Sequence, residues 1–204
     1  MNPSTAQALV MVDEFIRCGV TDAVVSPGSR SAPLAIALAQ AEERGEITLH
    51  VRLDERSAGY LALGLARVTG VPPIIVTTSG TAAVNLHPAI VEADQSGVPL
   101  IAITADRPPQ LRGVGANQVI AQVGVFGSDV RATIDMATAT RTTGAVRYWR
   151  STAARAVAAA TDALRAGPVQ LNMPFADPLV PDDDPEWIED LDGRADGRPW
   201  TADV

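Results

Sequence analysis

The stretch from His50 to Asn85 constrains the fold most, because strand and helix patterns alternate within it. Ile74–Val76 is a β-branched run without polar residues, which is typical of a strand covered on both faces. Before it, Ser57–Arg67 has helical character, with Leu61 and Leu65 four residues apart and small residues on the other faces. Strands that alternate with helices at this spacing predict an α/β domain with a mostly parallel sheet and helices on both faces.

The same alternation extends along the rest of the chain. We expect helices at Ser4–Cys18, Ala32–Arg44, Ala82–Ala93 and Ser151–Ala166, and strands at Ala23–Ser26, Thr48–Leu53, Val98–Thr104, Arg131–Ile134 and Val169–Met173. Ser4 and Ser151 are the expected N-caps of their helices. These elements predict one domain over residues 1–180. Residues 181–204 are acidic and rich in turn-forming residues, so we expect a linker or an extended tail outside the core.

Composition narrows the class of protein. The 204 residues are 47% hydrophobic but only 4% aromatic, so the core must be aliphatic and rich in alanine. A formal charge of -8 argues against nucleic acid or an anionic membrane as a partner. The lone Cys18 excludes an internal disulfide and a cysteine metal cluster. Because the sequence has no membrane-spanning apolar run and no amino-terminal signal pattern, we expect no membrane insertion and a cytoplasmic location.

Polar residues gather in the turns that follow the expected strands. These turns are Pro27–Ser31, Glu55, Thr78–Thr81 and Asp106–Arg107, and the glycine-rich loop 110–128 follows the last of them. In an open α/β sheet, ligands bind at the edge where the carboxyl ends of the strands lie. Gly80-Thr81 also opens a helix whose amide groups can face a ligand. The alternative is that these are ordinary turns followed by a solvated loop.

Three arginines and one glutamate in these turns are the candidate charged residues of a binding site. Arg30, Arg107 and Arg112 all fall in the turn set although the chain is acidic. Because arginine binds a carboxylate through two parallel hydrogen bonds, converging arginines indicate a substrate with carboxylates. Glu55 is less specific, since from position alone it is better explained as a first-turn acid favoured by the helix dipole.

Five motifs give the chain a close family resemblance. They are Ser26–Leu34, Thr78–Ala82, Thr104–Pro109, Gly115–Gln118 and Asn172–Leu179. Together with the stretch from His50 to Asn85, they resemble the pyrimidine-binding domain of thiamine-diphosphate enzymes. Each motif alone is a weak signal, but all five in this order are a strong one. The resemblance runs from about Ser4 to Leu179.

The resemblance implies a cofactor and a reaction. In the family, a glutamate at the position of Glu55 shares a proton with N1′ of the aminopyrimidine and so activates the cofactor, and an apolar, buried setting suits this role. The motifs are similar to those of one branch, whose members decarboxylate 2-oxoglutarate and add the remaining unit to isochorismate in menaquinone biosynthesis. By this resemblance, the residues facing thiamine diphosphate are Pro27, Glu55, Thr78, Ser79, Gly80 and Asn85. Those facing isochorismate are Ser29, Arg30, Ser31, Arg107, Asn117 and Gln118.

The chain departs from the family in one respect. Thiamine enzymes hold the diphosphate through Mg²⁺ (or Mn²⁺) on a second domain with a GDG motif, and these 204 residues contain no GDG. The chain therefore resembles the amino-terminal third of a longer enzyme, a homodimer or homotetramer in which cofactor sites lie between subunits. By itself it would hold half a site, and we expect no turnover from it.

Two other functions remain open from the sequence. The first is the pyrimidine-binding domain of another thiamine-diphosphate carboligase or decarboxylase, although a simple decarboxylase would have no use for a dicarboxylate-binding edge. The second is a non-catalytic nucleotide- or regulator-binding domain, but neither G-x-G-x-x-G nor G-x-x-x-x-G-K-[ST] is present. His50 and His87 lack metal-ligand spacing, and we expect structural or surface roles for both.

Overall fold

A single parallel sheet organises the molecule, whose computed structural model describes residues 1–201. The strand order is β2-β1-β3-β4-β6-β5, and every neighbouring pair is parallel. The strands are β1 Asp22–Val25, β2 Thr48–Val51, β3 Ile74–Thr77, β4 Leu100–Asp106, β5 Ala132–Asp135 and β6 Pro168–Pro174. The predicted fold class is confirmed.

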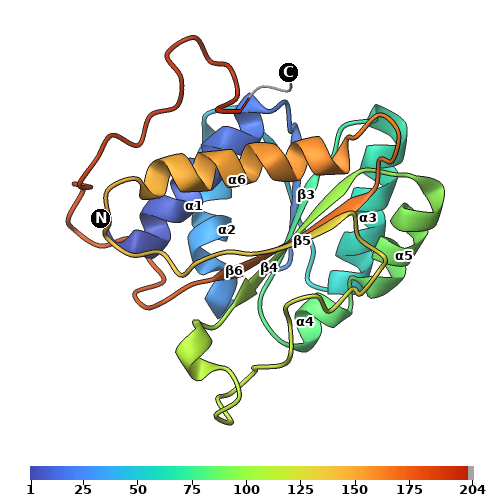
Figure 1. Ribbon diagram of the computed structural model, residues 1–204, viewed down its shortest axis with the longest axis horizontal. Coiled ribbons are helices and arrows are strands. Elements are labelled where there is room, and N and C mark those ends of the chain that lie inside the picture. Colours follow the sequence, from blue (N-terminus) through green and yellow to red (C-terminus); the bar gives the residue numbers. More distant parts are fainter. Residues whose placement is uncertain (202–204) are drawn as a thin grey trace.

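Helices cover both faces of the sheet, as parallel strands with crossover connections require (Figure 1). One face carries α1 Pro3–Arg17, α2 Ala32–Glu43 and α6 Ala145–Ala160, and the other carries α3 Glu55–Thr69, α4 Thr81–Val84 and α5 His87–Ser96. Two short 3-10 helices, η1 Ser29–Ser31 and η2 Pro109–Leu111, follow β1 and β4. Every residue of β3, β4 and β6 is buried, so these strands form the centre of the core.

Small residues allow close packing in the core, as the composition predicts. A Cβ atom added at Gly59 of α3 would lie 2.9 Å from the Cβ of Ala89 in α5. A larger side chain at Gly59 would therefore push the two helices apart. The expectation of a small-residue helix after Glu55 is confirmed.

Two predicted helices were wrong in their extent. The helix expected at Ala82–Ala93 is two helices, with Asn85 and Leu86 between α4 and α5. Pro88 explains the break, because its ring would clash with a carbonyl one turn earlier in a continuous helix. The helix expected at Ser151–Ala166 instead spans Ala145–Ala160.

The start of α6 is capped from a distant part of the chain. The Glu189 carboxylate accepts from the N–H groups of Gly144, at 2.9 Å, and Val146, at 3.0 Å. Ser151 lies inside the helix, so its predicted capping role is wrong. Ser4 is likewise not a cap, because Asn2 Oδ1 accepts from the N–H of Thr5 at 2.9 Å. Ser4 Oγ donates to the carbonyl of Ala176 instead, at 2.7 Å.

The segment from residue 181 to 201 has no helix or strand, but it lies against α1 and α6 rather than apart from the domain (Figure 1). Trp187 and Leu191 pack against the core, and the Trp187 ring lies 5.9 Å from that of Trp149. Arg150 donates to the Leu191 carbonyl at 2.5 Å. The expectation of a tail outside the core therefore differs from the structure.

Candidate functional site

The predicted polar turns lie together because the strands that they follow are parallel neighbours. In the sheet, β1 lies beside β3, and β3 lies beside β4, so their carboxyl ends meet at one edge. The turns Pro27–Ser31 and Thr78–Thr81 follow the first two strands, and Arg107 follows the third. Because ligands bind at this edge in open α/β sheets, it is the candidate site.

The first two turns are in direct contact. A Cβ atom added at Gly28 would lie 2.5 Å from Thr78 Cβ, so only glycine fits without displacing one of the two turns. Ser31 Oγ donates to the Gly28 carbonyl at 3.0 Å and closes the turn. This contact sets the spacing between the loops after β1 and β3.

Arg107 joins the third turn to the long loop. Its Nη1 donates to Ser79 Oγ and, at 3.3 Å, to the Gln118 carbonyl. Gln118 Nε2 donates back to the Ser79 carbonyl at 2.8 Å. Gly80 has a φ of 82°, and a Cβ there would lie 2.9 Å from Gln118 Cγ. The structure thus brings four predicted site residues together: Ser79, Gly80, Arg107 and Gln118.

Arg30 adds a second positive charge to the same edge. Its Nη1 donates to the Phe175 carbonyl at 2.7 Å and lies 3.7 Å from the carboxylate of the exposed Asp177. Burial, and then the charge of Arg30, lowers the pKa of Arg107, while Asp106 and Asp177 act in the opposite direction. The side-chain bonds of Arg107 go to neutral oxygens, so this edge favours an anionic ligand.

The predicted convergence of three arginines was wrong for Arg112. Its guanidinium lies 3.0 Å from Asp106 and makes two bonds to Asp135, at 2.9 and 3.1 Å. The hydrogen bond to Asp135 is the main reason why the pKa of Arg112 is raised. Arg112 is therefore engaged by acids of its own chain.

Glu55 is the first residue of α3, directly after the N-cap Asp54. Asp54 Oδ2 accepts from the N–H of Ser57 at 2.8 Å, which leaves Glu55 free of a capping role. Glu55 is only partly buried within this chain, so the apolar, buried setting that the resemblance implies for the complete site stays a prediction. Within residues 1–201, its carboxyl group has no hydrogen bond or ion pair.

The remaining predicted site residues line the surface of this edge. Pro27, Ser29, Asn85 and Asn117 are exposed, and among the described residues their side chains have no hydrogen-bond partner. Ser26 directly follows β1 and Thr77 is the last residue of β3, and both are buried. The hydroxyl groups of Ser26 and Thr77 have no partner among the described residues.

A buried polar network that was not predicted from the sequence lies beneath the site. Gln122 Oε1 accepts from the N–H of Gly80 at 2.8 Å, and its Nε2 donates to the Ala105 carbonyl at 3.0 Å. Gln122 thus ties the Ser79-Gly80 turn to the end of β4. The available signal was Gln170 and Asn172, two polar residues in an otherwise apolar strand. Gln170 Nε2 donates to the Gln122 carbonyl at 3.0 Å.

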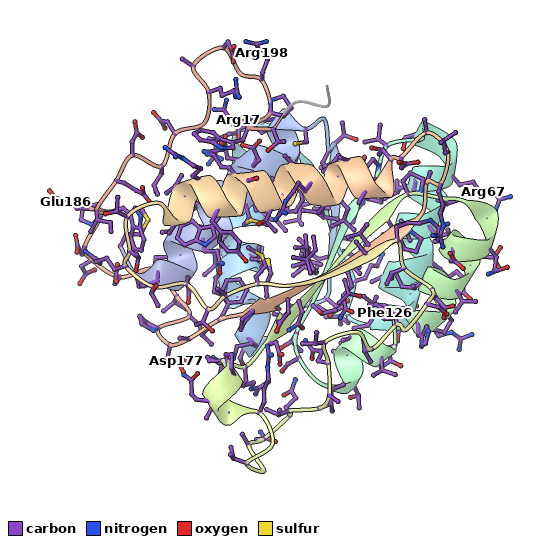
Figure 2. All side chains as sticks on the ribbon, viewed as in Figure 1. Arg17, Arg67, Phe126, Asp177, Glu186 and Arg198 are labelled. Atoms are coloured by element: carbon purple, nitrogen blue, oxygen red, sulfur yellow. The ribbon has the colours of Figure 1, made fainter. Side chains whose placement is uncertain are left out.

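Both histidines have structural partners, as expected. His50 Nε2 lies 2.9 Å from Asp22, and His87 Nε2 lies 2.9 Å from Asp129. The His87 ring also packs edge-on against Phe126, which anchors the end of the long loop beside α5 (Figure 2). Residues 1–201 contain no group of three or more His, Cys, Asp or Glu side chains suited to a metal ion. In the same range, no helix is both long and apolar enough to span a membrane.

Comparison with known proteins confirms the family resemblance. Residues 6–125 match the family described as thiamine pyrophosphate enzyme, N-terminal TPP binding domain, and the chain belongs to this family. It is 56% identical over 201 residues to "2-succinyl-5-enolpyruvyl-6-hydroxy-3-cyclohexene-1-carboxylate synthase" of Saccharopolyspora erythraea, covering 98% of this chain and 36% of that protein.

Mycobacterial relatives carry the same name. The chain is 53% identical over 207 residues to the synthase of Mycobacterium avium, with 98% of this chain and 38% of the relative covered. Against the Mycobacterium tuberculosis synthase, the identity is again 53%, with 98% and 37% covered. The chain therefore spans little more than a third of the length of these curated relatives.

Proposed function

We propose that this chain is the pyrimidine-binding part of a 2-succinyl-5-enolpyruvyl-6-hydroxy-3-cyclohexene-1-carboxylate synthase. The enzyme would decarboxylate 2-oxoglutarate with thiamine diphosphate and add the remaining four-carbon unit to isochorismate in menaquinone biosynthesis. The observation that carries the proposal is the pair Arg30 and Arg107 at the carboxyl edge of the sheet. Two neighbouring guanidinium groups suit a substrate with carboxylates, and isochorismate has two.

Thiamine diphosphate fits what this edge offers. The Glu55 carboxyl has no partner among the described residues, and the buried Ser26 and Thr77 hydroxyls, which also lack one there, lie at the strand ends. The bound cofactor would supply the carbon nucleophile of the reaction. Glu55 would hold a proton at its carboxyl oxygen and share it with N1′ of the aminopyrimidine. Pro27, Thr78, Ser79, Gly80 and Asn85 would surround the same ring.

The substrate side would consist of the arginine-bearing turns and the start of the long loop. Arg30 and Arg107 would bind the isochorismate carboxylates, and Ser29, Asn117 and Gln118 would contact its polar groups. The buried Ser31 would support this side by holding the Gly28 turn through its bond to the Gly28 carbonyl. Gln118 already bonds to the Ser79 carbonyl, so the substrate and cofactor parts of this edge share one hydrogen-bonded frame. This frame would orient the acceptor ring beside the cofactor.

In the full-length enzyme, further parts would complete the site. Mg²⁺ (or Mn²⁺) and the diphosphate would be held by residues outside this chain. A homodimer or homotetramer would place another domain over Glu55, which is only partly buried here. The chain alone would be inactive. We place the enzyme in the cytoplasm, without contact with nucleic acid or insertion into a membrane.

Two substitutions in the full-length protein test this proposal. Glu55→Gln should lower turnover about 10²–10⁴-fold, because an amide cannot share a proton with N1′. Arg107→Ala should weaken isochorismate use about ten- to a hundredfold, the effect of losing one charge-assisted hydrogen bond. It should leave 2-oxoglutarate decarboxylation nearly unchanged.

Arg67→Ala is the matched control, since Arg67 is exposed and lies far from Asp177 in the structure (Figure 2). Near-normal turnover of Glu55→Gln would contradict the role of Glu55. Equal damage to both half-reactions by Arg107→Ala would show a structural arginine. A full-length protein that decarboxylates 2-oxoglutarate but ignores isochorismate would favour a different thiamine-diphosphate decarboxylase.

A further inference from the structure

Asp106, which precedes Arg107 in the sequence, forms its hydrogen bonds and its ion pair with groups other than the Arg107 guanidinium. The Asp106 side chain is 1% exposed, and its Oδ1 accepts from the backbone N–H of Arg107 at 2.8 Å. Its Oδ2 accepts from Asn172 Nδ2 and lies beside Arg112 Nη2, at 3.0 Å in both cases. Asp106 is therefore held away from the Arg107 guanidinium.

Arg112 and Asn172 each bind two carboxylates. Arg112 bonds to Asp106 and, through two nitrogens, to Asp135. Asn172 Nδ2 donates to Asp135 Oδ1 at 2.8 Å as well as to Asp106. Asn172 is fully buried, and its Oδ1 accepts from Gln122 Nε2 at 2.9 Å and Thr104 Oγ1 at 3.1 Å. All four hydrogen-bonding positions of its amide are thus used, which makes the arrangement rigid.

The charges of this cluster agree with its geometry. Burial acts to raise the pKa of Asp135, but the hydrogen bonds from Arg112 and Asn172 outweigh it, and the pKa lies below its usual value. Arg112 is thus the cation that pairs with both aspartates, and its hydrogen bond helps to lower the pKa of Asp135. Among residues 1–201, in contrast, the Arg107 side chain bonds only to the neutral oxygens of Ser79 and Gln118.

We propose that Arg112 is a positioning residue that binds Asp106 and Asp135 and so keeps the Arg107 guanidinium free for a substrate carboxylate. The inference rests on the proposed function, because it assigns Arg107 a carboxylate ligand. Without Arg112, the carboxylates of Asp106 and Asp135 would lose their shared cation, and Asp106 is the one of the two whose charge acts on Arg107. Its field would oppose the binding of an anionic substrate at Arg107 and Arg30.

The experiment compares Arg112→Met with the double variant Asp106→Asn/Arg112→Met in the full-length protein. Arg112→Met should raise the KM for isochorismate about tenfold and leave the KM for 2-oxoglutarate unchanged. The double variant removes the unneutralised buried carboxylate, while the asparagine introduced at 106 still accepts from the N–H of Arg107. Its KM for isochorismate should return close to the wild-type value. Arg44→Met, which breaks an exposed pair with Glu46, is the control.

The outcomes separate an electrostatic role from a structural one. An unchanged KM for isochorismate in Arg112→Met would overturn the inference. So would a double variant as impaired as the single one, because a purely structural arginine is not rescued by removing an acid. Should Arg112→Met not fold, Arg112→Gln serves as the neutral variant and Arg112→Lys as the charged one. The KM of Arg112→Lys for isochorismate should lie closer to the wild-type value than that of Arg112→Gln, and equal KM values for these two variants would overturn the inference.

A substrate-free measurement separates this inference from the proposed function. Carbon-13 NMR of the carboxyl groups reports the pKa of Asp135 in wild type and in Arg112→Met. That pKa should rise above its usual value once Arg112 is gone, because burial then acts with less opposition. A wild-type enzyme that ignores isochorismate would refute the proposed function alone. An unshifted pKa of Asp135 would refute the role of Arg112 alone.

Discussion

Arg150 links three parts of the domain through a buried ion pair, and its replacement should be costly. Arg150 and Glu14 have side chains 1% and 0% exposed, and Nη1 lies 2.7 Å from Glu14 Oε2. The same Nη1 is 2.7 Å from Asp13 Oδ2, and Nη2 donates to the Leu191 carbonyl at 2.5 Å. Arg150→Met keeps a long linear side chain but leaves the Glu14 carboxylate buried. Removing one partner of a buried ion pair typically costs about 3–5 kcal/mol.

Denaturant and thermal unfolding of the chain at pH 7 measure this loss. For a domain of this size, about 1 kcal/mol corresponds to roughly 2–4 °C, so Tm should fall by about 6–20 °C. Arg44→Met is again the control, because its exposed pair with Glu46 is worth only about 0–1 kcal/mol. Glu14→Met/Arg150→Met should recover most of the stability, since no buried charge is then left unpaired.

Two results would refute this reasoning about Arg150. One is a loss below about 1 kcal/mol for Arg150→Met, within the range of exposed pairs, which would mean that water or Trp200 compensates Glu14. The backbone N–H of Trp200 already donates to Glu14 Oε1 at 2.5 Å. The other is a double variant that loses the sum of the two single effects, because independent losses would show that the two charges are not coupled.

Two further predictions concern pH and the isolated chain. The hydrogen bond from Arg131 is the main cause that lowers the pKa of Asp94. A carboxyl group whose pKa is lowered by folding stabilises the fold at pH values above its pKa in the unfolded chain, which is about 3.9 for aspartate. The stability advantage of wild type over Asp94→Asn should therefore be present at pH 6 and disappear as the pH falls through the pKa of Asp94 in the folded chain. Urea unfolding from about pH 6 to 2 checks this, and a pH-independent difference would contradict it. Thiamine diphosphate with Mg²⁺ should bind residues 1–204 weakly or not at all in calorimetry, and micromolar binding would show that the diphosphate site lies within this chain.

The central strands were predictable because burial on both faces leaves a local signature. Ile74–Val76 was predicted and β3 spans Ile74–Thr77, since a strand between two helix layers needs apolar side chains on both sides. The start of α6 was not predictable in this way. Its cap is Glu189, which lies more than forty residues further along the chain and approaches only because the segment after residue 181 folds back along α6.

The sequence could predict which site residues lie together where this depends on the position of their turns. The turns with Ser79-Gly80 and Arg107 come together because they follow the neighbouring parallel strands β3 and β4. Gln118 joins them because the long loop after β4 returns to this edge. Glu55 shows the limit of that argument. Topology places it at the start of α3, but its burial depends on what covers this edge, and the described residues cover it only in part.

Arg112 was misjudged because its partners depend on strand order, which chain order does not reveal. The sheet places β6 between β4 and β5, although β5 precedes β6 in the sequence. Asn172 of β6 pairs in register with Asp135 of β5 and with Thr104 of β4, and so reaches acids on both sides. Only this order brings Asp106 and Asp135 within reach of one arginine. Three turn arginines that look equivalent in the sequence thus differ in their partners. Arg112 pairs with two acids of its own chain, Arg30 lies 3.7 Å from the exposed Asp177, and the Arg107 side chain donates to neutral oxygens.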